Sequence, residues 1–491
     1  MKWAYHREDY LLIIRELGVL LIIVAFLLLL PLVVAQIYNE PSTVSPFLIS
    51  SILSGTLGVL FRLSPARTEF ERKHAIALVV ISWPIISIPS ALPFYLNGTA
   101  PTFLDGYFEA ISGWTTTGLT TIGANADLFA HSINFWRHLM QYLGGLGIIV
   151  MGIIVLAPLR DWETTSELAV AAGRKYRIVP SLSNTIKIIM GMYGIFLAAG
   201  TVLLYFSGLS FFDALCHAMA GFSTGGFSTR GASLGAFNSS WVTLISLPIM
   251  IIGATNFVLV YYLFSGNLKD YIKDIESRVF WYFWIIFIGG LIIWFAFRNA
   301  GHSDSLDVIF MITSALTTTG WSTIPASAVF LQWAPLALIA IILSMLIGAN
   351  ASSTGGGLKA FRVGLMIKNI YWLTRKNVMP DSLKINKSYC HIEDKNIDDE
   401  ELQHIMTFMI LYFVILFLSF IIFMIFNFPI LTSFYEVTSA IGTVGLSSGI
   451  TSTGINPLLK IVLCVDMWLG RIEILPTLYF MMYIYKSYVQ K

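Results

Sequence analysis

The sequence predicts an all-α protein that crosses a membrane several times and is built from four related repeats around a central ion pore. Of its 491 residues, 56% are hydrophobic and only 12% are charged, whereas an ordinary soluble protein carries about 25% charged residues. Long apolar runs follow one another, and several reach the roughly 20 residues that a membrane-spanning helix needs. A short Thr/Gly sequence recurs four times between these runs, and this recurrence predicts the repeats.

The recurring sequence is Trp-Thr-Thr-Thr-Gly-Leu-Thr-Thr at 114–121, with later copies at 222–229, 316–323 and 441–448. Aligned, the copies give a threonine column, a variable column and a glycine column. Read across these three columns, the four copies in chain order are Thr116, Thr117 and Gly118; Thr224, Gly225 and Gly226; Thr318, Thr319 and Gly320; and Thr443, Val444 and Gly445. Irregular backbone at membrane depth survives where it lines a cavity, and its carbonyl oxygens can replace the hydration shell of an ion. Four copies in register therefore predict a selectivity filter; coincidental small-residue helix packing is the weaker alternative.

Two membrane spans are expected before the first repeat, at 11–37 and 46–62. The first run is longer than the apolar core of a signal peptide, so we expect it to be retained. Each repeat should contain an outer helix, a short helix, the Thr/Gly strand and a second helix. The expected outer helices are 74–97, 187–208, 279–299 and 405–428, and the second helices are 134–159, 239–265, 331–367 and 456–485. The chain then divides into an N-terminal pair at 1–73 and repeats at 74–160, 161–266, 267–368 and 369–491.

The segment before each strand is too short to span a membrane. Asp105, Asp213 and Asp307 each stand where the first turn of such a short helix should lie. A carboxylate there meets unpaired N–H groups and the positive end of the helix dipole. The fourth copy has Thr432 in this column. We expect four short pore helices whose carboxyl ends point towards the membrane centre.

The distribution of basic residues predicts the topology. Lysine and arginine gather at 62–73, 160–187, 269–278 and 359–395, whereas the loops 38–46, 98–103 and 122–133 contain none. The positive-inside rule makes the basic side cytoplasmic and puts the N-terminus there. This arrangement holds only if the four Thr/Gly segments enter and leave the membrane on the same side, so we expect them to be re-entrant.

A run of small residues interrupts the second helix of the third repeat, at 348–358. The predicted gate residues are Gly348, Ala349, Asn350, Ala351, Ser352, Ser353, Thr354, Gly355, Gly356 and Gly357. Such a run should break the helix midway and lie across the pore as a movable plug. A phosphate loop is excluded because Gly357 is followed by Leu358 rather than by Lys and Ser or Thr. A tight helix-packing turn remains the alternative.

Arg471 lies deep in the last apolar segment. A charge at that depth costs several kcal/mol unless it faces water or a partner. It therefore either faces the conduction path, where it would repel cations, or is satisfied by snorkelling or by a salt bridge to another repeat. The sequence leaves both interpretations open.

Several function classes are excluded by what the sequence lacks. A net charge of +2 gives no reason to expect a nucleic-acid partner, and Cys216, Cys390 and Cys464 have no metal-ligand spacing. His217 is interpreted as a structural residue of an apolar helix. The sequence contains no HExxH motif and no pair of acidic residues within a span. We therefore expect a protein that is not an enzyme.

At these residues the sequence resembles the TrkH/TrkG branch of the Trk/Ktr/HKT superfamily of potassium transporters. The resemblance rests on the four strands and on the motifs at 141–150, 253–256, 353–359 and 470–473. It implies four pseudo-symmetric units and a homodimer with one pore in each subunit. It also implies K⁺ bound at the filter residues, a gate at 348–358 beneath the filter, and Arg471 below it. A cytoplasmic ring of TrkA-like nucleotide-binding subunits is a further implied partner, for which the basic loops 160–187 and 359–395 offer docking surfaces.

The resemblance implies potassium uptake across the bacterial inner membrane, with K⁺ as cargo, lipid as surroundings and nucleotide bound only by the regulatory partner. Gly225 and Val444 depart from a symmetric filter because they offer no hydroxyl. Gly118 favours potassium, since some plant relatives have serine there and pass sodium. A Na⁺- or H⁺-coupled symporter of the same fold is the alternative within this class. A membrane enzyme or receptor scaffold is the alternative outside it.

Overall fold

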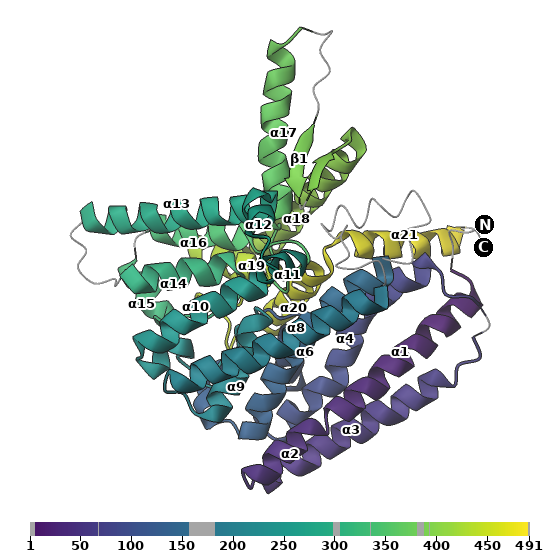
Figure 1. The fold of residues 1–491 in the computed structure, drawn as a ribbon. Coiled ribbons are helices and arrows are strands. Elements are labelled where there is room, and N and C mark those ends of the chain that lie inside the picture. The colour runs from purple at the N-terminus through teal and green to yellow at the C-terminus, as the bar shows by residue number, and fades with distance from the viewer. Residues whose placement is uncertain are drawn as a thin grey trace.

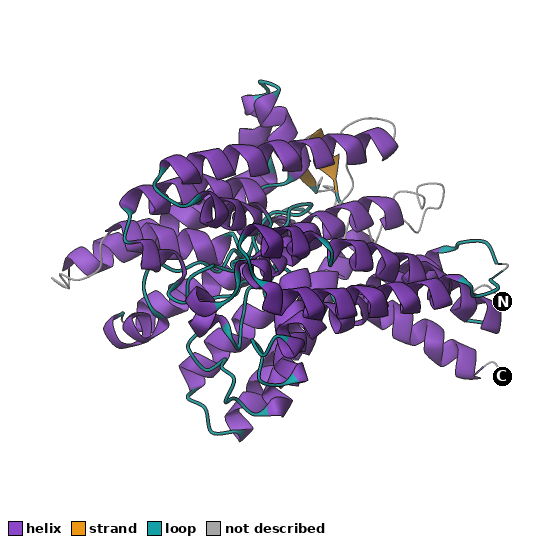
Figure 2. Ribbon diagram, turned by 90° about the horizontal axis from the view of Figure 1, so that it is seen from below, coloured by secondary structure: helices purple, strands orange, loops and turns teal. Residues whose placement is uncertain are grey.

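The computed structural model describes residues 5–66, 68–156, 182–297, 305–333, 335–380, 387–391 and 393–489. Over these residues the protein is mostly helical. Loops meet in the middle of the molecule, with helices around them (Figure 2). Arg160, Arg174, Lys175 and Arg177 of the predicted basic loop lie outside the described residues, as does the boundary between the first two repeats.

The N-terminal segment contains α1 (Arg7–Leu27), α2 (Leu30–Ile37) and α3 (Pro41–Arg62). Small and hydroxylated residues let α1 and α3 pack closely. A Cβ atom added to Gly18 would lie 2.6 Å from the carbonyl oxygen of Gly58. Ser54 and Ser51 on α3 donate hydrogen bonds of 2.8 Å to the carbonyls of Leu21 and Ala25 on α1. Such contacts are typical of helix pairs in lipid, where apolar burial alone gives little driving force.

Four helical units follow, each with the predicted order of elements. The outer helices are α4 (Arg72–Leu96), α8 (Leu182–Phe206), α13 (Ile275–Phe297) and α18 (Asp399–Ile425). The short helices are α5 (Phe103–Trp114), α9 (Phe211–Phe222), α14 (Ser305–Leu316) and α19 (Ile430–Ile441). The second helices are α6 (His131–Leu156), α10 (Ser240–Ala254) with α11 (Phe257–Phe264), α16 (Pro335–Ile347) with α17 (Ala360–Val378), and α20 (Pro457–Ile472) with α21 (Leu475–Val489).

Smaller elements connect these units. They are the 3-10 helices η1 (Gly123–Leu128) and η3 (Ser233–Phe237) and the helices α12 (Leu268–Lys273) and α15 (Ala326–Gln332). Among the described residues, six helices are long and apolar enough to cross a membrane, or seven if the bent pair α10–α11 counts as one span. These helices agree with a polytopic membrane protein.

The short helices begin as their sequences predict. Asp105, Asp213 and Asp307 all lie in first turns. The hydroxyl of Thr102 accepts a hydrogen bond of 3.2 Å from the N–H of Asp105, and Ser210 accepts one of 3.0 Å from Asp213. These caps satisfy N–H groups that the helix itself leaves unpaired.

Three of the four second helices are broken, whereas the sequence predicted only the break in the third repeat. α10 and α11 meet at an angle of 115°, and Asn256 caps α11 by accepting a hydrogen bond of 3.0 Å from Val258 N–H. In the fourth repeat, α20 ends because Glu473 and Ile474 both adopt positive φ angles, +66° and +55°. Continuous helices at 239–265 and 456–485 were therefore wrong predictions.

An antiparallel hairpin of β1 (Ser388–His391) and β2 (Glu393–Asn396) was not predicted, so the chain is not strictly all-α. Ser388 pairs with Asn396, and His391 pairs with Glu393. α17 and β1 rise together from the helical body (Figure 1). The hairpin is the only sheet among the described residues, and its base contacts α13.

Glu40, between α2 and α3, joins the N-terminal helices to α6. Its carboxylate accepts hydrogen bonds from the N–H groups of His131 and Ser132, at 2.6 and 3.0 Å, and from the Ser132 hydroxyl at 2.8 Å. Burial alone would raise the pKa of Glu40. The hydrogen bonds from Ser132 and His131 outweigh burial, so the pKa lies below its ordinary value.

Candidate functional site

The four Thr/Gly strands share one unusual backbone conformation. The first-column threonines Thr116, Thr224, Thr318 and Thr443 have φ angles of +53°, +49°, +55° and +48°. The glycines two residues later have φ angles between +78° and +95°. A positive φ is uncommon for a residue with a branched side chain, costs about 1–3 kcal/mol and is typical of functional sites. Its recurrence in all four copies indicates that one requirement acts on all of them.

The four strands approach one another in a closed ring. An added Cβ at Gly118 would lie 2.2 Å from the carbonyl oxygen of Gly225 in the second strand. The same relation joins Gly226 to the carbonyl of Thr319 at 2.0 Å. The ring continues from Gly320 to Val444 at 2.0 Å and closes from Gly445 to Thr117 at 2.2 Å. Each glycine column position thus leaves room for a carbonyl of the next strand.

The variable column is fixed through its backbone. The N–H groups of Thr117, Gly225, Thr319 and Val444 donate to carbonyls near the end of the preceding short helix, at 2.9, 2.7, 2.9 and 2.9 Å. The hydroxyls of Thr117 and Thr319 lie 2.8 Å from those of Thr115 and Thr317, the residues that directly follow the short helices α5 and α14. The missing hydroxyls of Gly225 and Val444 therefore leave the backbone of the ring unchanged.

The first-column hydroxyls divide into two pairs. Thr224 Oγ1 donates to Thr354 Oγ1 at 3.1 Å, and Thr318 Oγ1 accepts from Gly356 N–H at 2.8 Å. Thr116 Oγ1 and Thr443 Oγ1 are buried and have no hydrogen-bond partner within the described part of the chain. Buried polar atoms are normally satisfied, so these two oxygens are candidate ion ligands.

The far end of the first strand is tied to its own short helix by a buried carboxylate. Glu109 accepts hydrogen bonds from Thr120 Oγ1 at 2.7 Å and from Arg137 Nε at 2.6 Å. Arg137 also donates to the carbonyl of Ser228 in the second strand at 3.0 Å. The Glu109–Arg137 pair therefore braces two neighbouring strands.

Each of the other strands is also hydrogen-bonded to its own short helix, but through different side chains. His217 lies 2.9 Å from the hydroxyl of Ser228 and 2.7 Å from the carbonyl of Asp213, as expected of a structural histidine. Thr323 donates to Asp307 at 2.7 Å. In the fourth repeat, Glu436 accepts from the N–H and hydroxyl of Ser448, at 2.6 and 2.7 Å.

The loop 348–359 separates α16 from α17 and lies against the threonine column. Its contacts with Thr224 and Thr318 are given above, and a Cβ at Gly356 would lie 2.1 Å from Thr443 Oγ1. Thr354 Oγ1 lies 3.0 Å from the carbonyl oxygen of Phe222 and 2.9 Å from that of Gly253, and its single hydroxyl proton is shared between these two acceptors. The helix break predicted at 348–358 is present, and the loop touches three of the four strands.

Backbone hydrogen bonds connect this loop to the break in the second repeat. Asn350 N–H donates to the carbonyl of Ala254 at 3.0 Å, and Phe257 N–H donates to that of Ser352 at 3.3 Å. The loop also closes on itself, because Ala349 N–H donates to Gly356 at 3.2 Å. The unpredicted break at Thr255 and Asn256 therefore supplies partners for the loop.

Arg471 is buried and contacts the loop directly. Its guanidinium donates to the carbonyl of Thr354 at 2.5 Å and to that of Gly144 on α6 at 3.2 Å. Glu473, two residues further on, pairs with Arg362 on α17 at 2.6 Å. A small cavity beside the loop is lined by Ile148, Ser353, Gly355, Gly356, Lys359, Gly470, Arg471 and Glu473.

The sequence analysis assigned no role to Gln141. This residue lies on α6 and forms hydrogen bonds with the backbone of the second strand. Its amide oxygen accepts a hydrogen bond of 3.1 Å from Phe227 N–H, and its amide nitrogen donates to the carbonyl of Gly225. Gln141 is fully buried. Its side-chain amide in an otherwise apolar helix could have indicated this role, because a buried amide requires hydrogen-bond partners.

A family model, two relatives and one solved structure that resemble this chain are all described as cation or potassium transporters. Residues 40–488 match the family model TrkH, described as cation transport protein. An uncharacterized cation transporter of Methanocaldococcus jannaschii is 30% identical, with 96% of this chain and 95% of that protein covered. The Trk system potassium uptake protein TrkH of Escherichia coli K12 is 28% identical, with coverage of 94% and 96%. The crystal structure of the potassium transporter TrkH from Vibrio parahaemolyticus superimposes with a TM-score of 0.84 at 25% identity, covering 96% of this chain and 98% of that one.

Proposed function

The chain belongs to the TrkH family of cation transport proteins, and from this premise we propose that it is a potassium uptake protein whose ion path runs through the ring of four strands. Two proteins of Escherichia coli K12 that are named Trk system potassium uptake proteins, TrkH and TrkG, match over nearly their whole length. The observation that carries the proposal is the closed ring, in which Gly118, Gly226, Gly320 and Gly445 each approach a carbonyl of the next strand.

In this proposal K⁺ exchanges its hydration shell for backbone carbonyls of the three columns and for hydroxyls of the threonine column. The short helices direct their carboxyl ends, which carry partial negative charge, at the same region. Two buried first-column hydroxyls without partners among the described residues support this assignment. The membrane potential would contribute about 2.3 kcal/mol per elementary charge per 100 mV to inward movement.

The loop 348–358 acts as the gate in this proposal. Its contacts with Thr224 and Thr318 support a plug directly below the filter. Arg471 holds the loop through Thr354 and places a positive charge beside the path of the cation. Opening then requires the loop to leave the threonine column.

The wider assembly follows the family resemblance. We place the protein in a bacterial inner membrane with its N-terminus in the cytoplasm, as the basic loops indicate. We propose a homodimer regulated by TrkA-like nucleotide-binding subunits, with α17 and the hairpin within the basic region 359–395 as a docking surface. No chemical reaction is assigned to the chain.

The test is uptake of radioactive Rb⁺ into liposomes that contain the purified full-length protein, with K⁺ or Na⁺ as competitor. Uptake that K⁺ blocks and Na⁺ does not would establish a potassium pathway. Uptake that requires a Na⁺ or H⁺ gradient would establish the symporter instead. Absence of uptake under all conditions, with or without the regulatory subunits and nucleotide, would contradict the proposal.

A further inference from the structure

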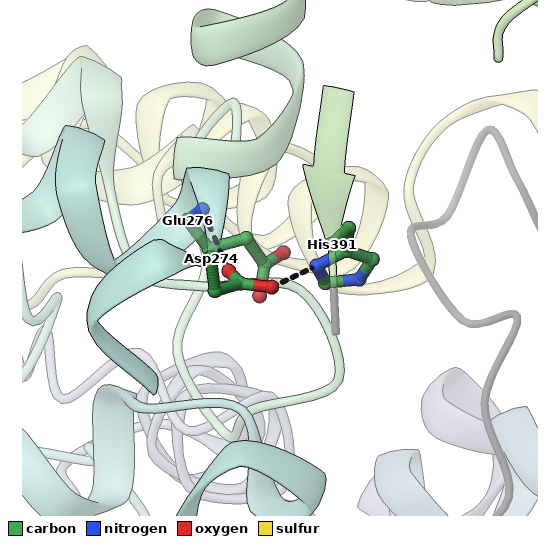
Figure 3. A group of neighbouring side chains, drawn as sticks. All are labelled: Asp274, Glu276 and His391. Carbon is green, nitrogen blue, oxygen red and sulfur yellow. Dashed lines mark hydrogen bonds and ion pairs between the residues drawn. The ribbon is translucent and has the colours of Figure 1, made fainter. Parts of the chain in front are cut away.

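Three side chains of metal-ligand type meet where α13 begins: Asp274, Glu276 and His391 (Figure 3). All three are buried, with at most 1% of each residue exposed. One potential ligand atom from each lies within 4.8 Å of the others. Asp274 Oδ2 and His391 Nδ1 are 2.7 Å apart. This cluster takes no part in the ring of strands described above.

Local structure fixes the positions of all three groups. Asp274 immediately precedes α13, and its Oδ1 accepts a hydrogen bond of 2.8 Å from Glu276 N–H, so both carboxylates come from one helical turn. His391 ends strand β1, and its ring packs against Phe361 of α17 with 5.0 Å between ring centroids. The hairpin thus carries an imidazole to two carboxylates of a different repeat.

Further hydrogen bonds orient the carboxylate of Glu276. Its Oε1 accepts from Ala351 N–H at 2.9 Å, and its Oε2 accepts from the side-chain amide of Asn256 at 3.2 Å. Each carboxylate oxygen has two lone pairs, so both oxygens retain capacity for another ligand. Metal-binding carboxylates are commonly held by outer hydrogen bonds of this kind.

Charge and ligand type indicate what would occupy the cluster. Two ionised carboxylates with a neutral imidazole carry two negative charges, which a divalent ion balances. An imidazole ligand suits Zn²⁺ and related transition metals better than Mg²⁺ or Ca²⁺. Zinc sites with a free coordination position use three protein ligands of these types. A protonated imidazole paired with Asp274 is the competing explanation.

We propose that Asp274, Glu276 and His391 form a binding site for one divalent transition-metal ion of the zinc class. The ion would join the hairpin to α13 and, through Glu276, to Ala351 in the loop 348–358. Metal occupancy therefore holds the loop in the position seen here, against the threonine column. This effect on the loop rests on the proposed function, whereas the binding site itself does not.

The binding test uses the purified full chain, stripped with a chelator and titrated with Zn²⁺, with Mn²⁺ and Mg²⁺ as comparisons. Bound metal is measured by elemental analysis, and folding by size-exclusion profile and thermal unfolding midpoint. We expect one Zn²⁺ per chain and a higher midpoint on loading. His391→Asn and Glu276→Gln should each weaken binding by at least about tenfold. His404→Asn, a histidine on α18, is the matched control and should bind as the wild type does.

Two results would overturn the site. Equal zinc binding by the wild type and both folded variants would mean an adventitious ion only. No zinc binding by the folded wild type would leave a hydrogen-bonded His–Asp pair without metal. Testing both variants guards against the misfolding of one, since His391 and Glu276 lie on different elements.

The effect on the loop is measured separately, as Rb⁺ uptake by zinc-loaded and stripped protein. We expect several-fold slower uptake by the loaded wild type and no such difference for His391→Asn. Zinc binding with equal uptake would overturn the link to the loop. If neither form of the wild type carries Rb⁺, the proposed function fails, while the zinc measurement still decides the site.

Discussion

Arg471 donates a hydrogen bond of 2.5 Å to the backbone carbonyl of Thr354, the loop residue whose hydroxyl accepts from Thr224. The same guanidinium donates to Gly144 on α6. Arg471 belongs to the fourth repeat, Thr354 to the third, Thr224 to the second and Gly144 to the first. A single side chain therefore connects the loop to the whole ring of repeats.

Arg471→Ala should increase Rb⁺ uptake several-fold. The substitution removes the donors to Thr354 and Gly144 and the positive charge beside the path, so the loop is released more easily. Hydrogen bonds from a charged group contribute about 1.5–3 kcal/mol each. Since about 1.4 kcal/mol corresponds to a factor of ten, the loss of these bonds is more than enough for a several-fold rise in the open population. Flux into proteoliposomes measures it. Arg278→Ala, at an arginine on α13 that donates to Ile272, is the control; unchanged flux in Arg471→Ala would remove Arg471 from the gate.

Gly118→Ser should reduce discrimination between K⁺ and Na⁺ by about tenfold or more, equivalent to about 1.4 kcal/mol. The new Cβ would lie 2.2 Å from the Gly225 carbonyl, so the two strands must separate. Competition between K⁺ and Na⁺ for Rb⁺ uptake reports the change. Gly98→Ser is a matched control, because Gly98 also has a positive φ of +76° but an added Cβ would meet nothing within 4 Å. Equal selectivity in the two variants would argue against the ring as the filter.

Glu436→Gln should weaken K⁺ binding while leaving the protein folded. The carboxylate accepts from Ser447 Oγ and from Ser448 N–H and Oγ, and an amide NH₂ cannot accept the bonds on its side. The end of the fourth strand should then become mobile, raising the K⁺ concentration that half-blocks Rb⁺ uptake several-fold. Glu400→Gln, at an exposed residue of α18, should behave as the wild type. An unaltered half-blocking concentration in Glu436→Gln would show that this tie does not influence the filter.

Glu40→Gln should destabilise the protein by about 1.5–3 kcal/mol near neutral pH, because charge-assisted bonds to Ser132 and His131 are lost. The pKa of Glu40 is lowered in the folded protein. Its contribution to stability is therefore complete above the unfolded value of about 4.3 and is lost as pH falls through the lower folded value.

Thermal unfolding in detergent at several pH values tests this linkage. The difference between the wild type and Glu40→Gln should shrink as the solution is acidified below about pH 4. Glu8→Gln, at an exposed residue near the start of α1, serves as the comparison. A difference that is constant with pH would mean that the carboxylate charge of Glu40 does not support the fold.

Most of the fold could be predicted from the four sequence repeats. Four Thr/Gly copies and the apolar runs around them predicted the order outer helix, short helix, strand and second helix. The bounds of the outer helices lie close to the predicted ones, whereas those of the broken second helices do not. The break at 348–358 was predictable because three consecutive glycines and small polar residues disfavour a helix. The roles of the filter and gate residues remain predictions that the experiments above address.

Other features could not be predicted, because they depend on contacts between residues that are far apart in the sequence. Glu473 and Ile474 end α20 with positive φ angles, although neither residue type favours that conformation. Tertiary packing therefore overrides local preference there. Asp274 and His391 come from different repeats, with no motif spacing that would place them together.

The closed ring has a consequence for how the protein is made. The contact between Gly445 and Thr117 unites strands from the first and last repeats, so the ring is incomplete until the C-terminal repeat has left the ribosome and entered the lipid. A nascent chain truncated before that point would present three strands with an unpaired face. Premature termination late in translation should therefore yield inserted protein that has most of its helices and no intact ring.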